Sequence, residues 1–234
     1  MGFSFGEMWH TMGVPAKIVG AFLVTMGLAS LTVFIERVLA LRRSRASARA
    51  FASEAGAKLQ AGKVDAVIAE AGKHPHGHLP RLVKAGLDLY TQARGAAEPS
   101  ELSAAERTKR HLERQIELLG ADLRRGMPVL ASVGSVAPFV GLLGTVVGII
   151  SAFQGIAASG SGGLSSVSAG ISEALVETAL GLAVAIPAML AFNFLSSQMA
   201  TEEMALQSSA GELVDMLEGW GDQEPATVRH ERVA

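Results

Sequence analysis

Three long apolar stretches constrain the fold of this 234-residue chain more than any other feature. They run from about residue 18 to 35, from 129 to 157 and from 170 to 196, and the first two carry no charged side chain. Each is far longer than a buried β-strand, and a lipid interior requires the backbone polar groups to be satisfied within the segment. We therefore expect an all-α integral membrane protein with three transmembrane helices.

The composition agrees with this class and disfavours several others. Apolar residues make up 49% of the chain and charged residues 18%, which is more apolar and less charged than an average soluble domain. The absence of cysteine excludes disulfides and thiolate chemistry. We find no serine-nucleophile motif, no HExxH zinc helix and no histidine in any span, so an enzyme is not expected. No cofactor, metal or nucleic-acid partner is expected either.

The basic residues predict how the chain crosses the membrane, because Lys and Arg beside a span stay on the cytoplasmic side. No Lys or Arg occurs between residues 155 and 172. We therefore expect the N-terminus outside, a large cytoplasmic loop, a short external loop and the C-terminus inside. Lys17 is the sole basic residue before the first span, which favours a permanent anchor over a cleaved signal peptide. The basic residues flanking the cytoplasmic loop are Arg37, Arg42, Arg43, Arg45, Arg49, Arg124 and Arg125.

The loop and the C-terminal tail carry helical patterns of their own. Ser103 and Glu106 have the spacing of a capping box, and the helix that follows is expected to continue through Gly126 into the second span. Leu206, Leu213, Leu217 and Trp220 predict an amphipathic C-terminal helix. The expected segments are an external N-terminal segment (1–15), transmembrane helix 1 (16–41), a cytoplasmic helical domain (42–127), transmembrane helix 2 (128–157), an external loop (158–169), transmembrane helix 3 (170–199), a cytoplasmic helix (200–221) and a disordered tail (222–234).

The motif HPHGH places His74, His76 and His78 at alternating positions in the cytoplasmic loop. Imidazoles are good zinc or copper ligands, so a metal site is one interpretation. Alternating positions supply no closed tetrahedral shell, however, and we favour a Pro/Gly turn between helices.

Small residues recur along one face of the second span at intervals of four and three. Such a stripe lets another helix approach closely, which is how membrane helices pack. Thr145 is the hydroxyl of this stripe, and Gly144 to Gly148 forms a GxxxG motif beside it. The stripe consists of Gly134, Pro138, Gly141, Thr145, Gly148, Ala152 and Gly155.

The third span is small and acidic on one side and apolar on the other. Glu173 and Glu177 lie in the first sector, with Thr178 at its flank, and Pro187 is expected to perturb the helix locally. The acidic sector comprises Gly170, Glu173, Glu177, Gly181, Val184, Ala188 and Ala191, opposite Leu175, Leu182, Ile186 and Met189.

Two acids within a membrane span point to ion transport. An ionised side chain at membrane depth costs at least a few kcal/mol, so such acids normally face a bundle interior or a wet cavity. The alternative for Glu173 is an interfacial position near the outer surface, and for a threonine taken alone a structural hydroxyl bonded to the backbone is favoured over an ion contact. For Glu173 and Glu177 we favour an ion pathway, to which Thr145 and Thr178 can contribute because a hydroxyl both donates and accepts hydrogen bonds. The residues expected to set helix packing and pore shape are Pro138, Gly141, Gly144, Gly148, Gly181 and Pro187.

Two runs carry a resemblance to a known family: APFVGLLGTVVGIISAF (137–153) and GISEALVETALGLAVAIPAMLAFN (170–193). Together with Glu36 and Arg37 at the inner end of the first span, they are similar to the ExbB/TolQ/MotA proton-channel family, in its three-span ExbB and TolQ branch. The resemblance implies a homopentamer around a central pore in the bacterial inner membrane. It also implies that an ExbD, TolR or MotB-like single-span partner with a membrane aspartate stands inside that pore.

The function implied is that of a pore-forming subunit in a motor driven by the proton motive force. The family's pore threonines correspond to Thr145 and Thr178, and its intramembrane glutamate to Glu173. The chain departs from the usual pattern at Glu177, Val147 and Phe192. A non-conducting scaffold subunit of an envelope transport complex is the alternative, and the sequence indicates neither the process powered nor proton against sodium.

Overall fold

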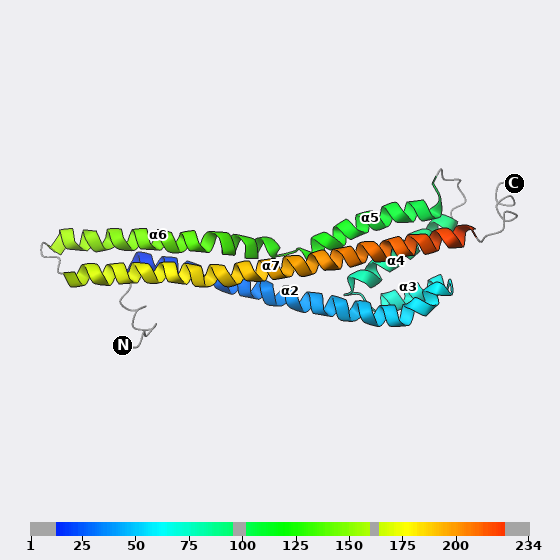
Figure 1. The fold of residues 1–234 in the computed structure, drawn as a ribbon, viewed down its shortest axis with the longest axis horizontal. Helices are drawn as coiled ribbons and strands as arrows, with labels where there is room; N and C mark the ends of the chain where they lie inside the picture. Colours follow the sequence, from blue (N-terminus) through cyan, green and yellow to red (C-terminus); the bar gives the residue numbers. More distant parts are fainter. Residues whose placement is uncertain (1–12, 96–101, 160–163, 223–234) are drawn as a thin grey trace. The chain divides into compact units, whose positions relative to one another are not determined.

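The computed structural model describes residues 13–95, 102–159 and 164–222, and every regular element in these ranges is an α-helix (Figure 1). The expected all-α class is therefore confirmed. The ends assigned to an external segment and to a disordered tail lie outside the described residues, apart from Gly13 to Pro15 and Asp222. The helices are α2 (Val14–Gln60), α3 (Val64–Gly72), α4 (His78–Gly95), α5 (Ala104–Leu123), α6 (Met127–Ser159) and α7 (Leu164–Asp222).

Three of these helices are long and apolar enough to cross a membrane. The candidate spans lie within Val14–Gln60, Met127–Ala157 and Ser168–Trp220, in agreement with the three apolar stretches of the sequence. The protein is thus a multi-pass helical membrane protein. Its homopentameric assembly stays a prediction.

The chain folds as two compact units. The first, here called the membrane unit, falls within Met1–Arg37 and Gly126–Ser196. The second falls within Val38–Arg125 and Ser197–Ala234 and is here called the cytoplasmic unit, after the side of the membrane that the sequence predicts for it. Both α2 and α7 run without interruption from one unit into the other.

The membrane unit has small side chains inside and large apolar side chains outside. Ala137, Ala185 and Ala188 are buried in its core with Leu23 and Val133. Large apolar side chains face outward, among them Phe139, which is 70% exposed, and Leu190, which is 65% exposed. A soluble domain rarely presents so much contiguous apolar surface, whereas lipid covers it without cost. Other outward side chains are Leu142, Leu143, Phe153, Leu175, Leu182, Ile186 and Phe194.

The cytoplasmic unit has an ordinary soluble core. Ser103 caps α5 by accepting a hydrogen bond of 3.1 Å from the backbone N–H of Glu106, so the expected cap is confirmed. The hydroxyl of Tyr90 on α4 donates to the carbonyl of Leu217 on α7 at 3.2 Å. The predicted apolar face at the end of α7 is inside, with Leu206, Leu213 and Leu217 buried, and α5 buries Leu112, Leu119 and Leu123.

One expected boundary is wrong. The helix that begins at Ala104 does not continue through Gly126, because α5 ends at Leu123 and Gly126 has a φ of 80°, which a continuous α-helix cannot contain. The third span lies within a helix that begins before residue 170, since α7 begins at Leu164.

Candidate functional site

The backbones of α6 and α7 touch in the membrane unit, and the two helices run side by side in Figure 1. A Cβ atom added to Gly141 would lie 2.8 Å from the carbonyl oxygen of Glu177 and 3.2 Å from the Cα of Gly181. A Cβ atom added to Gly181 would lie 2.7 Å from the carbonyl oxygen of Ala137. Real Cβ atoms do not approach this closely, so glycine at both positions is what allows the contact.

Glu177 is sealed in this α6–α7 seam. Its side chain is 0% exposed, and neither carboxyl oxygen has a hydrogen-bond partner among the described residues. Gly144 lies directly opposite: a Cβ atom there would overlap the Oε2 atom of Glu177. An isolated carboxylate in an apolar environment is very costly, so this pocket suits the uncharged acid.

Glu173 lies one turn earlier on α7 in a different environment. It is half-buried, and its Oε1 atom accepts a hydrogen bond of 2.8 Å from the backbone N–H of Gly13, directly before α2. Backbone N–H groups at a helix N-terminus lack partners within the helix, so this position suits a hydrogen-bond acceptor such as the Glu173 carboxyl oxygen. The two glutamates therefore differ: Glu173 has a polar partner, and Glu177 has none among the described residues.

Both predicted threonines donate their hydroxyl hydrogen to a backbone carbonyl. The hydroxyl of Thr178 donates across the seam to Gly141 at 3.1 Å, and that of Thr145 donates to Leu142 on its own helix at 2.7 Å. A hydroxyl oxygen keeps acceptor capacity when its hydrogen is used. Each threonine can thus accept a hydrogen bond from water or from a protonated acid.

The remaining predicted residues are distributed along the unit. Pro138 lies inside α6 and Pro187 lies inside α7, and both helices continue past the proline without a break. A Cβ at Gly148 would lie 3.1 Å from the Cβ of Ala174. Arg37 is buried and donates to Glu36, which is 61% exposed, at 2.6 Å.

The pairing of Gly144 with Glu177 was not predicted from sequence. Gly144 is one position off the small-residue stripe that contains Gly141 and Thr145, and its sequence signal is a GxxxG motif with Gly148. The available signal was that the third span contains an uncommon second acid, Glu177, while the second span contains an additional glycine, Gly144. Deciding which glycine faces the acid needs the rotation of both helices, which sequence does not specify.

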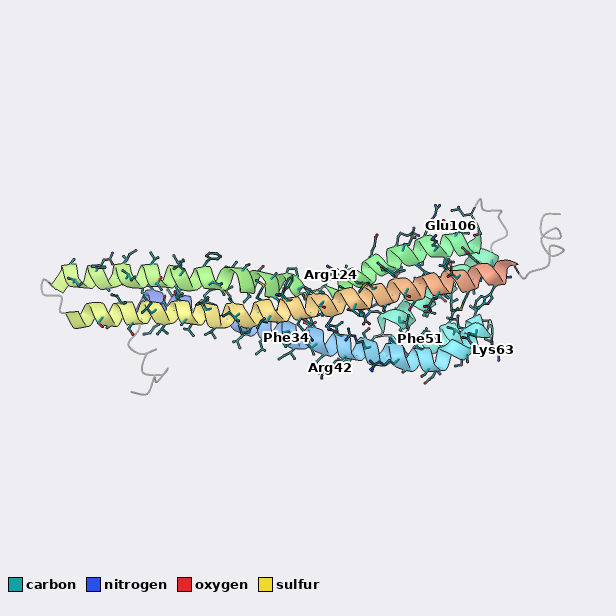
Figure 2. The ribbon with its side chains drawn as sticks, viewed as in Figure 1. Phe34, Arg42, Phe51, Lys63, Glu106 and Arg124 are labelled. Atoms are coloured by element: carbon teal, nitrogen blue, oxygen red, sulfur yellow. The ribbon has the colours of Figure 1, made fainter. Side chains whose placement is uncertain are left out.

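A two-pronged ion pair of the cytoplasmic unit joins the C-cap residue of α5 to α7. Arg124 donates two hydrogen bonds of 2.8 Å to the two carboxyl oxygens of Glu203 (Arg124 is labelled in Figure 2). The guanidinium lowers the pKa of Glu203, and the carboxylate raises the pKa of Arg124. Gly120 leaves room for this pair, because a Cβ there would lie 3.1 Å from the Oε1 atom of Glu203.

The pattern of the MotA/TolQ/ExbB proton channel family matches residues 76–208, which is more than half of the chain and includes the α6–α7 seam. The chain belongs to this family. The resemblance seen in the two sequence runs is therefore confirmed, and the chain is a membrane protein of an ion-transport family.

Individual relatives agree with this assignment. The biopolymer transport protein ExbB of Neisseria gonorrhoeae is 37% identical over 122 residues, covering 50% of this chain and 55% of the relative. ExbB of Salmonella typhimurium is 41% identical over 109 residues, covering 47% and 45%. ExbB of Pseudomonas putida is 31% identical over 139 residues, covering 56% and 42%. The chain thus matches about half the length of these relatives.

Proposed function

We propose that this chain is the pore-forming subunit of an envelope motor driven by the proton motive force. Five copies would enclose a pore lined by α6 and α7, in the bacterial inner membrane, with the N-terminus outside and the C-terminus in the cytoplasm. An ExbD/TolR/MotB-like single-span protein with a membrane aspartate would stand inside the pore. Proton flow would rotate the ring of pore subunits relative to the single-span protein inside it.

The observation that carries the proposal is the concentration of titratable and hydroxyl groups in one part of an otherwise apolar unit. Glu173, Glu177 and Thr178 follow each other within two turns of α7, and Thr145 lies on α6, the helix packed against them. Placing two carboxyl groups at membrane depth is expensive, and function is the usual reason for keeping them there.

The chemistry of these groups suits proton transfer. Glu173 has one polar neighbour and partial exposure, so it can exchange a proton with water or with a partner's aspartate. Thr145 and Thr178 have their hydroxyl hydrogens committed to carbonyls. Their oxygens can therefore accept from an incoming protonated group. A charge crossing 100 mV releases about 2.3 kcal/mol, enough to bias one conformational step.

The test is proton flux in vesicles. The chain is purified from its native membrane together with any copurifying single-span protein, reconstituted with a pH-sensitive dye inside, and energised by a potassium gradient with valinomycin. Native mass spectrometry counts the subunits. We expect Glu173→Gln and Thr178→Val to abolish the flux while the complex stays assembled. The matched controls are Glu212→Gln and Thr201→Val, the same changes on the cytoplasmic part of α7.

A scaffold role is the second candidate, and the bond from Gly13 to Glu173 favours it. In that case Glu173 would hold the start of α2 against α7 without conducting. Loss of assembly in Glu173→Gln, with no flux from the intact wild-type complex, would establish the scaffold and refute the motor.

A further inference from the structure

One group of side chains in the cytoplasmic unit is arranged like metal ligands. Glu54 lies on α2, Glu70 lies on α3, and His74 follows the residue that caps α3. One ligand atom from each of the three lies within 4.8 Å of the other two. The turn between α2 and α3, in which Gly62 has a φ of 68°, brings these distant positions together.

Glu70 is the centre of the group. It is 3% exposed, and its Oε2 atom accepts hydrogen bonds from Lys58 at 2.8 Å and from Lys73 at 3.1 Å. Its Oε1 atom is buried and has no hydrogen-bond donor among the described residues. Leaving a buried carboxylate oxygen without a partner is costly, so a donor or a cation that binds Oε1 of Glu70 would stabilise the fold.

The carboxyl group of Glu54 lies near that of Glu70, because a ligand atom of each lies within 4.8 Å of the other. Lys58 and Lys73 contact the Oε2 atom of Glu70, whereas no donor among the described residues reaches its Oε1 atom. Carboxylate oxygens only accept, so a cation bound between the two side chains would satisfy Oε1 and a carboxyl oxygen of Glu54 together.

His74 adds a nitrogen ligand to the two carboxyl oxygens. Its ring stands edge-on to Phe51 on α2, with the ring centres 6.3 Å apart and the planes at 70° (Phe51 is labelled in Figure 2). The other histidines of the HPHGH motif go elsewhere: His76 is exposed, and His78 lies against the hydroxyl of Ser44 at 2.6 Å. The motif therefore forms no site by itself, and one of its members joins acids from two helices.

We propose that Glu54, Glu70 and His74 bind one divalent transition-metal cation of the zinc class and tie the end of α2 to α3. Two carboxylate oxygens and one imidazole nitrogen suit zinc, with the fourth position open to water. Zinc binds such atoms at roughly 2.0–2.2 Å, which sets neighbouring ligands about 3.4 Å apart. Glu54 is exposed, so its side chain can move the remaining distance.

The two ammonium groups set the strength of this site. Lys58 and Lys73 occupy the Oε2 atom of Glu70, which leaves Oε1 for the metal. They also repel a cation, so we expect weaker binding than in a closed structural zinc site. The imidazole disfavours Mg²⁺ and Ca²⁺, which prefer oxygen ligands alone.

The test uses the untagged full-length protein in detergent, stripped with a chelator and titrated with Zn²⁺ against a fluorescent zinc indicator. We expect one equivalent to bind and to raise the thermal unfolding midpoint. Glu54→Gln and His74→Ala should each weaken binding at least ~10-fold, the loss typical even of changes outside the ligand shell. His76→Ala, the exposed histidine of the same turn, is the matched control and should bind like wild type.

Cobalt gives an independent spectroscopic measurement. Co²⁺ added to the stripped protein should produce visible absorption bands that the His74→Ala variant lacks, and circular dichroism shows whether that variant keeps its helices. The proposal is overturned if the wild type binds no zinc, or if Glu54→Gln and His74→Ala bind it as tightly as wild type. Either result would show that these three side chains hold no metal.

Discussion

Substituting Gly144 by alanine tests the packing of the α6–α7 seam most directly. The new Cβ atom would overlap the Oε2 atom of Glu177 and would lie 2.8 Å from its Cδ and 3.0 Å from its Cβ. Carbon atoms pack best at roughly 3.5–4.0 Å. The Cδ contact is thus about 0.7 Å too short on the ~3.5 Å limit. Turning the carboxyl group away does not relieve the contact, because the clash extends to the Cβ atom.

The expected cost follows from this overlap. Overpacking a well-packed core by one methyl group costs about 1–3 kcal/mol, against which the higher helix propensity of alanine returns up to about 1 kcal/mol. We expect Gly144→Ala to destabilise the protein by about 1–2 kcal/mol on balance. Gly148→Ala is the matched control, because its new Cβ would meet the Cβ of Ala174 at 3.1 Å and could be accommodated by a small shift.

The assay is a double-mutant cycle in detergent micelles, with unfolding followed by circular dichroism as a denaturing detergent is added. Glu177→Ala removes the Oε2 and Cδ atoms that make the two shortest contacts and leaves only the 3.0 Å contact with the Cβ atom, so the double variant should recover most of the loss caused by Gly144→Ala. A coupling energy of about 1–2 kcal/mol is expected for residues in contact. Additive effects within about 0.5 kcal/mol, or a Gly144→Ala variant no weaker than Gly148→Ala, would refute the sealed-seam geometry.

Three further predictions concern other parts of the chain. Glu177→Ala should reduce proton flux less than Glu173→Ala, because the family's intramembrane glutamate corresponds to Glu173, and equal or reversed losses in the vesicle assay would contradict this. Gly126→Ala should destabilise the protein by about 1–2 kcal/mol, because residue 126 has a φ of 80° and a side chain in this conformation is strained. Gly56→Ala, whose Cβ would meet no atom within 4 Å, is the control in the same unfolding assay. The ion pair of Arg124 with Glu203 should stabilise the cytoplasmic unit at neutral pH. Its contribution, about 1 kcal/mol or less because Arg124 is largely exposed, should vanish in acid. The pKa of Glu203 is lower in the folded chain than its ordinary value, so the unfolded chain binds the proton first and stability falls as pH falls through the folded pKa. Glu203→Gln should flatten the acid side of a plot of stability against pH, and an unchanged plot would show that the pair contributes nothing.

Features that depend on neighbours in the sequence could be predicted, and features that depend on helix rotation could not. The three spans follow from composition over some 20 residues, and the cap of α5 follows from Ser103 and Glu106 alone. The break at Gly126 was missed although its signal was present. A glycine just past one helix and Pro128 just inside the next are typical of a helix end followed by a helix start. Apolar residues at helical spacing occur on both sides of this junction, and that pattern favours one continuous helix.

In the candidate sites, too, features set by local sequence could be predicted and features set by tertiary packing could not. The acidic sector of α7 could be predicted from the 100° rotation per residue of an α-helix. The glycine that faces it could not, because its identity depends on how α6 is rotated about its own axis. The sequence places His74 beside His76 and His78, and no local pattern connects it to Glu54 and Glu70. Contacts of this kind are set by tertiary packing, which a single sequence does not fix.

In the proposed motor, the different surroundings of Glu173 and Glu177 would give different roles to two acids that stand one turn apart. A group that carries protons must meet a proton donor and an acceptor in turn, and Glu173 has both partial exposure and a polar contact at Gly13. Glu177 has no exposed surface and no partner among the described residues, so its proton can leave only if α6 and α7 separate at Gly144. Among the described residues the closed seam offers no group to stabilise a charge on Glu177, so in the proposed cycle ionisation of Glu177 and closure of the seam would exclude each other. If the motor moves α6 against α7 during its cycle, that movement would decide when Glu177 can titrate. Locking the seam with a cross-link should then leave Glu173 as the sole acid available to the proton path.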